Sequence, residues 1–94
     1  MQQNVISLND SVEYQSGSVV SKEILKTEGG TVTIFAFDAG QGLSEHAAPF
    51  NALVQIIDGE AQINIEKTSY TLTEGQLIKL PANKPHSLKA LKRF

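Results

Sequence analysis

The chain contains two histidines, His46 and His86, and each lies in a segment marked by glycine and proline. Imidazole nitrogens bind divalent metals, form hydrogen bonds and transfer protons near neutral pH. Two imidazoles brought together would therefore form part of a metal site or a polar anchor for a small ligand. The sequence has no cysteine, which excludes thiolate ligands, disulfides and cysteine nucleophiles.

The first histidine segment runs from Gly40 through His46 to Gly59. It resembles the first motif of the cupin family, in which a glycine, two histidines, a glutamate and a second glycine follow one another at fixed spacing. Gly40, His46 and Gly59 match this pattern in register. Ala48 stands at the position of the second histidine, and Ala52 stands at the position of the glutamate.

The second segment runs from Gly75 to His86 and resembles the second cupin motif. Gly75, Pro81 and His86 are in register, and Asn83 stands where a glycine is usual. The resemblance extends from about residue 19 to the last residue and is strongest to short stand-alone bacterial cupins. It implies a jelly-roll β-barrel in which both histidines project from neighbouring strands into one cavity.

A complete cupin site offers three imidazoles and a carboxylate to a metal ion, and only two of these four ligands are present here. The resemblance therefore implies at most weak binding of a divalent ion (zinc, nickel, iron, manganese or copper) at His46 and His86, with water or substrate completing the shell. Glu45 on a strand would face away from His46, and Asn51 and Gln55 offer only carbonyl oxygens. None of them is a convincing third ligand.

Short apolar patterns of period two indicate the strands that must position these histidines. They predict strands at residues 19–26, 31–37, 52–57, 61–66, 68–72, 76–80 and 86–91, with a short edge strand at residues 5–8. The dipeptide Asp58-Gly59 predicts a tight hairpin between residues 52–57 and 61–66. Residues 73–75 predict a second hairpin between the next two strands. With no helical pattern of three turns, the chain is expected to be an all-β sandwich or barrel.

Strand alternation predicts which side chains lie inside this barrel. Four aliphatic residues share the inner face and are expected to line a ligand cavity with the histidines as its main polar feature: Val54, Ile56, Ile63 and Ile65.

Ninety-four residues suffice for one domain, with residues 1–18 as an N-terminal arm or edge strand and residues 19–94 as the barrel. The cupins that the chain resembles usually add a further apolar strand after the stretch that corresponds to residues 87–94, where this sequence stops. Barrel closure is therefore expected to involve the arm or a partner subunit. An open sheet edge also favours a homodimer.

The formal charge of −2 is spread along the chain, and the three cations near its C-terminal end read as a solvated tail, so no nucleic-acid partner is expected. No targeting pattern or long apolar run occurs in the sequence. We therefore expect no membrane partner and a cytoplasmic location.

Three functions remain open from the sequence, which does not decide whether the protein is an enzyme. In the first, His46 and His86 anchor a small molecule with one polar end, such as a carboxylate or carbonyl, without turnover. In the second, the same histidines hold a metal for an oxygenase or isomerase type of reaction. In the third, the barrel is a non-catalytic dimeric scaffold.

Overall fold

The computed structural model describes residues 4–94; residues 1–3 of the predicted arm lie outside the described residues. The described chain contains one short 3-10 turn, η1 (Leu8–Asp10), and eight strands. The strands are β1 (Val19–Thr27), β2 (Gly30–Phe37), β3 (Gly42–His46), β4 (Ala52–Gln55), β5 (Glu60–Ile65), β6 (Thr68–Thr73), β7 (Leu77–Leu80) and β8 (His86–Ala90). The all-β prediction is confirmed. Among residues 4–94, no helix is long and apolar enough to cross a membrane.

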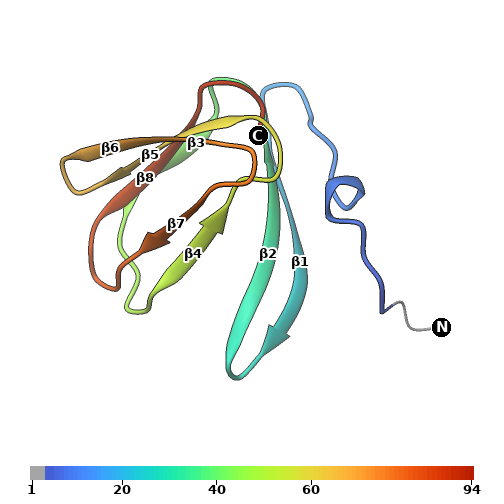
Figure 1. Ribbon diagram of the computed structural model, residues 1–94, viewed down its shortest axis with the longest axis horizontal. Coiled ribbons are helices and arrows are strands. Elements are labelled where there is room, and N and C mark those ends of the chain that lie inside the picture. Colours follow the sequence, from blue (N-terminus) through green and yellow to red (C-terminus); the bar gives the residue numbers. More distant parts are fainter. Residues whose placement is uncertain (1–3) are drawn as a thin grey trace.

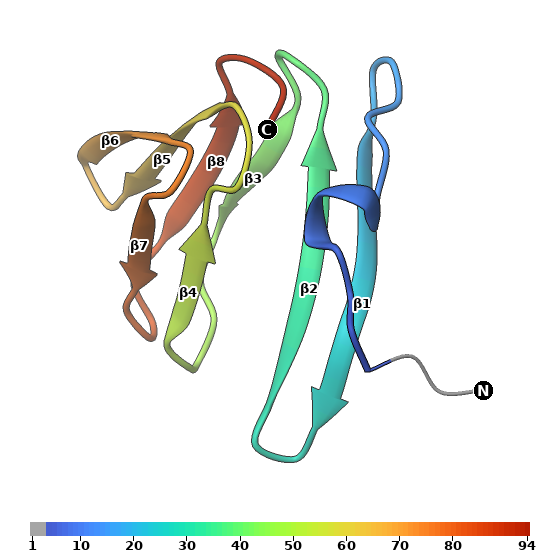
Figure 2. The ribbon, with the colours of Figure 1, turned by 45° about the vertical axis from the view of Figure 1, so that its right-hand side comes forward.

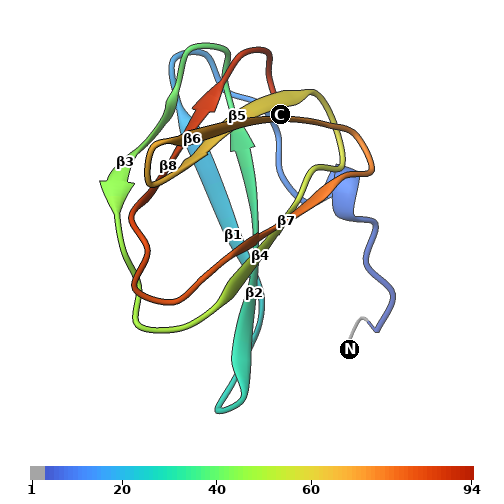
Figure 3. The ribbon, with the colours of Figure 1, turned by 60° about the vertical axis from the view of Figure 1, so that its left-hand side comes forward.

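The strands form three antiparallel sheets (Figure 1). The largest has the order β3-β8-β5-β6, and β4 pairs with β7 in a second sheet. Figure 3 shows β5 and β6 on one side of the barrel and β4 and β7 on the other. The third sheet is the β1–β2 hairpin, whose far end extends beyond the other strands (Figure 2).

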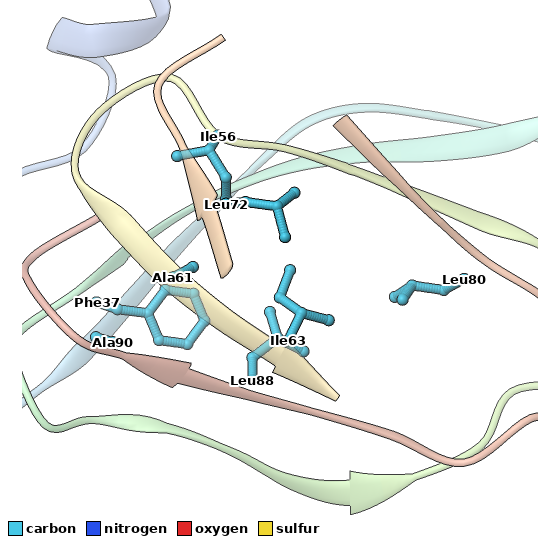
Figure 4. Packing of buried hydrophobic residues seen from close by; sticks show 8 residues of the cluster. All are labelled: Phe37, Ile56, Ala61, Ile63, Leu72, Leu80, Leu88 and Ala90. Carbon is cyan, nitrogen blue, oxygen red and sulfur yellow. The ribbon is translucent and has the colours of Figure 1, made fainter. Parts of the chain in front are cut away.

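The core lies between these sheets and is built from alternate residues of each strand. Ala61 and Ile63 are completely buried, because both face the core from β5, the strand that pairs on both sides with β6 and β8. The other buried members of the cluster come from five different segments: Phe37, Ile56, Leu72, Leu80, Leu88 and Ala90 (Figure 4). The predicted inner face of residues 52–57 and 61–66 is confirmed, and Leu53 on the outer face is 65% exposed.

Both predicted hairpins are wrong. The strands on either side of Asp58-Gly59 belong to different sheets, because β4 pairs with β7 whereas β5 pairs with β6 and β8. The tight hairpin is instead the one between β5 and β6, which turns at Glu66 and Lys67 with Glu66 at φ 54°. Neither residue is typical of a tight turn, so the sequence carried no signal for it.

Two further strand predictions differ from the structure. Residues 5–8 form no edge strand, since residues 4–7 lie outside any regular element and Leu8 begins η1. Conversely, β3 was not among the predicted strands, because Gly42 and the polar residues around His46 do not give an apolar pattern.

The C-terminal residue closes the structure against β2. Phe94 exchanges two backbone hydrogen bonds with Phe37, of 2.8 and 3.1 Å, and the two rings stack with centroids 4.3 Å apart. Beside this pair, the Asp38 carboxylate accepts hydrogen bonds from Arg93 Nε at 2.8 Å and from the Gly17 backbone N–H at 2.7 Å. These contacts tie the last residues of the chain and the segment just before β1 to the end of β2.

A second set of contacts anchors the N-terminal arm near the turn after β4. Tyr14 donates a hydrogen bond to the Asp58 carboxylate, and Asn9 Nδ2 donates one of 3.4 Å to the carbonyl of Ile57. Burial, together with the bond to Asp58, raises the pKa of Tyr14 to about 12. The phenol therefore keeps its proton and remains a donor throughout the physiological range.

Gly59 provides the first test of this closure, because its φ is 83° and an added Cβ would lie 1.6 Å from the carbonyl oxygen of Arg93. We predict that Gly59→Ala lowers the free energy of unfolding by about 2 kcal/mol or more, measured by urea denaturation. The matched control is Gly30→Ala, where a Cβ meets no atom within 4 Å. We expect the control to change stability by less than about 1 kcal/mol. Equal losses in the two variants would contradict the close packing at Gly59.

The Asp38 contacts predict a pH-dependent contribution to stability. The hydrogen bond from Arg93, followed by that from Gly17, lowers the pKa of Asp38 in the folded protein. A lowered pKa means that the carboxylate stabilises the fold above its unfolded pKa of about 4 and loses this effect as the pH falls through its folded value. Asp38→Asn should therefore lower the urea midpoint at neutral pH, and its difference from wild type should shrink in acid. The exposed substitution Glu74→Gln serves as control, and a pH-independent difference would contradict the assignment.

Candidate functional site

The two histidines meet because β3 pairs with β8. Gly42 lies opposite Lys89 and Leu43 opposite Leu88, but the register then shifts, so that His46 lies opposite His86. The shift is a β-bulge that places one extra residue in β3. Without this bulge Glu45 would lie opposite His86, and His46 would face the other side of the sheet.

Close approach of the two strands depends on Gly42. A Cβ at this position would lie 2.1 Å from the carbonyl oxygen of Leu88 and 3.1 Å from its carbonyl carbon. Any side chain would therefore push β3 away from β8. This explains the glycine four residues before His46 as a packing requirement of the site.

Two loops leading to the histidines are bonded to each other. The Asn83 N–H donates to the carbonyl of Ala48 at 2.7 Å, and the Ala82 N–H donates to Asn51 Oδ1 at 2.9 Å. Asn83 has a φ of 65°, which accounts for the glycine usual at this motif position. Asn51, considered above as a metal donor, instead holds the loop that delivers His86.

The Nδ1 atoms of both imidazoles face backbone carbonyls. His46 Nδ1 lies 2.8 Å from the carbonyl oxygen of Ser44, and His86 Nδ1 lies 3.2 Å from that of Lys84. A carbonyl oxygen only accepts hydrogen bonds, so each Nδ1 must carry a hydrogen. In the neutral state, each Nε2 is then an unprotonated nitrogen with a free lone pair.

These two Nε2 atoms point at each other across 3.1 Å. The rings meet edge to face, with centroids 4.3 Å apart and planes at 70°. Two lone pairs at this distance repel each other unless a positive centre or a donated hydrogen lies between or beside them. Both Nε2 atoms can therefore accept a hydrogen bond from one hydroxyl group, or bind one proton or cation.

The two histidines differ in their access to solvent. His86 is buried, with 7% of its surface exposed, whereas His46 is exposed at the rim. On the far side of His86, β5 places the half-buried Ile65 directly opposite it. A ligand arriving from the His46 side would thus meet two nitrogen acceptors with an aliphatic side chain beyond them.

The four predicted lining residues occupy two environments. Ile56 and Ile63 belong to the packed core and are 1% and 0% exposed, whereas Val54 and Ile65 are half-buried and pack against it. The structure brings only Ile65 into cross-strand pairing with a histidine. The cavity lined by all four residues stays a prediction.

Hollows on the surface of residues 4–94 lie away from this pair. One of about 420 Å³ lies between the arm and β1, where Ile6 and Asp10 meet Lys22 and Ile24. Another of about 220 Å³ lies where β6 and β7 diverge, beside Tyr70. Neither includes a histidine.

The donors at this pair meet only part of what a metal ion needs. Two imidazole ligands at tetrahedral angles on zinc have nitrogens about 3.4 Å apart, close to the 3.1 Å found here. However, residues 4–94 contain no group of three or more His, Asp or Glu side chains arranged to hold an ion. Ala48 and Ala52 offer no donor. The residues therefore do not fit a tightly held catalytic metal.

Sequence reasoning identified His46 and His86 but not the groups that orient them. The carbonyls of Ser44 and Lys84 fix the imidazole tautomers, and the bulge before His46 turns its ring toward His86. Residue types carry no signal for a backbone carbonyl's direction, so only the folded chain could reveal this.

Comparison with known proteins agrees with the fold. The family model described as the AraC-like ligand-binding domain matches residues 28–93. A conserved protein of unknown function from Streptococcus pyogenes shares 32% identity over all of this chain and 82% of its own, with a TM-score of 0.91. A cupin superfamily protein from Desulfitobacterium hafniense shares 24% identity over 100% and 86% of the two chains, also with a TM-score of 0.91.

A cupin 2 conserved barrel domain protein from Leptotrichia buccalis shares 34% identity over 93% of this chain and 41% of its own, with a TM-score of 0.86. No curated protein matches the chain. The predicted cupin jelly-roll barrel is confirmed.

The tautomer assignment is directly testable by NMR of the imidazole nitrogens. In alkaline buffer, we expect His46 and His86 each to show a protonated Nδ1 and an unprotonated Nε2 in long-range proton–nitrogen spectra. Carbonyl oxygens at 2.8 and 3.2 Å stabilise this form of both rings. His46→Ala and His86→Ala assign the signals. A protonated Nε2 on either neutral ring would contradict the arrangement.

Proposed function

This chain belongs to the AraC-like ligand-binding domains of the cupin superfamily, and we propose that it binds a small hydroxyl-bearing molecule at the His46–His86 pair. The observation that carries the proposal is the 3.1 Å approach of two Nε2 atoms in rings whose Nδ1 atoms face backbone carbonyls. Such a pair accepts hydrogen bonds and has no N–H to offer a carbonyl or carboxylate while both rings are neutral.

The direction of these hydrogen bonds narrows the ligand expected from the sequence. A carboxylate or carbonyl end would need a donor, whereas a hydroxyl group supplies the hydrogen that two lone pairs lack. Ile65, opposite His86, would contact the less polar part of the same molecule. The packed Ile56 and Ile63 support a ligand at the barrel mouth better than one deep in the core.

Access and rigidity also support binding at the mouth. His46 is open to solvent, while His86 is buried on β8 and its Nδ1 faces the carbonyl of Lys84. The bonds from Asn83 and Ala82 to the opposite loop limit the movement of both rings. Little side-chain entropy would be lost when such a prearranged pair binds its ligand.

The test is a titration of imidazole-labelled protein with glycerol, monosaccharides and small hydroxy acids, each beside a keto or deoxy counterpart. We expect at least one hydroxylated compound to shift both Nε2 resonances, and its counterpart to bind more weakly. Loss of one acceptor by His46→Ala or His86→Ala should weaken binding about fivefold to tenfold.

Gln55→Ala, on the outer face of β4, is the matched control and should bind normally. If no compound shifts the Nε2 signals, or if binding survives in both histidine variants, the proposal fails. Zinc chloride, added in the same titration, tests the metal alternative. We expect weak binding, because two imidazoles alone are too few ligands to hold zinc tightly. Tight, stoichiometric zinc binding lost in His46→Ala would favour a metalloprotein instead.

A further inference from the structure

The hollow between the N-terminal arm and β1 contains charged groups that the ligand site proposed above does not use. Its volume is about 420 Å³, within the range of pockets that hold small molecules. The arm runs beside β1 (Figure 2), and both supply walls of the hollow. Neither histidine lines it, so it is separate from the pair on β3 and β8.

A β-bulge in β1 shapes one wall of this hollow. The pairing of β1 with β2 shifts register between Glu23 and Leu25, so Ile24 is an extra residue in β1. Consecutive side chains of a regular strand point to opposite faces. The bulge interrupts this alternation, and the consecutive residues Lys22, Glu23 and Ile24 all line the same hollow.

The opposite wall belongs to the arm, where hydrogen bonds hold η1 in shape. The carbonyl of Ser7 accepts hydrogen bonds from the Asp10 N–H at 3.1 Å and from Ser11 Oγ at 2.9 Å. Asn9 Nδ2 links the same turn to the carbonyl of Ile57. These bonds keep Asp10 beside β1, where it lines the hollow.

The lining combines three charges with an apolar surface. Asp10, Lys22 and Glu23 are exposed, and none of them forms an ion pair with another residue of the described range 4–94. Ile6, which is 42% exposed, and the half-buried Ile24 line the same hollow. The hollow therefore offers two negative charges, one positive charge and aliphatic side chains.

A ligand that complements this lining carries two positive charges, one negative charge and a hydrocarbon chain. We propose that the hollow binds a free basic amino acid, of which L-lysine is the simplest example. Its carboxylate pairs with Lys22, and its two ammonium groups pair with Asp10 and Glu23. Its methylene chain covers Ile6 and Ile24. A diamine would leave Lys22 without a partner, and a hydrated metal ion would leave the apolar surface uncovered.

The first experiment follows the backbone amide signals of the protein by NMR while L-lysine is added. We expect saturable shifts at Asp10, Lys22 and Ile24, and weaker binding at high salt, because ion pairs between exposed groups are screened. L-Norleucine lacks the side-chain ammonium group and cadaverine lacks the carboxylate, so each should bind more weakly. Absence of saturable shifts at these residues, or equal binding of the three compounds, overturns the proposal.

The second experiment assigns the charges by substitution at exposed positions, which leave the core intact. Asp10→Asn should weaken the binding of both L-lysine and cadaverine about threefold. Lys22→Gln should weaken L-lysine binding by a similar factor without weakening cadaverine binding, because cadaverine has no carboxylate. Equal losses of both compounds in Lys22→Gln would contradict the assigned pairing and overturn the proposal.

Matched controls make the same changes of net charge outside the hollow. Glu28→Gln and Lys26→Gln alter exposed residues that do not line it and should bind L-lysine normally. Losses equal to those of the hollow variants would indicate attraction to the overall surface charge. His46→Ala should also bind L-lysine normally, and a loss there would place the compound at the histidine pair. Either result overturns the proposal and leaves the hydroxyl-ligand site to its own test.

Discussion

Antiparallel pairing of β3 with β8 governs both the barrel and its candidate site. The pairing starts at Gly42, where the strands approach closely enough to exclude a side chain, and ends with His46 opposite His86. Between them, one extra residue in β3 reverses which face the following side chain occupies. Because β8 also pairs with β5, the same register places His86 beside Ile65. The register of these strands therefore also sets the geometry of the site.

The chemistry of the pair follows from backbone carbonyls rather than from neighbouring charges. Each ring gives its Nδ1 hydrogen to a carbonyl two residues earlier in the chain, at Ser44 or at Lys84. This leaves two acceptors facing one another with one ring buried and the other open. With alanine at the other two motif positions, the site retains acceptor geometry without a carboxylate. Such an arrangement favours recognition of a hydrogen-bond donor over tight retention of a metal.

Closure of the barrel depends on the opposite end of the molecule. Phe94 stacks on Phe37 and pairs with its backbone, while Asp38 links Arg93 to the arm through Gly17. These contacts cover the end of β2 at Phe37, whereas Phe35, two residues earlier, is 42% exposed. The ligand site proposed on β3 and β8 therefore lies on different strands from these contacts.

The sequence by itself determined the all-β class, most strand positions and the inner face of β4 and β5, because each depends on local alternation. Its motif residues also selected His46 and His86 as the candidate site. It misplaced the hairpins, since the Asp58-Gly59 turn joins strands of different sheets and the true β5–β6 turn has no typical turn residue. Only the tertiary structure decided the β3 bulge, the imidazole tautomers and the uncovered face of Phe35. The bulge arises where strands far apart in the sequence pair, and the tautomers depend on where carbonyls two residues away point. Side-chain identity alone encodes neither the pairing nor the direction of a carbonyl.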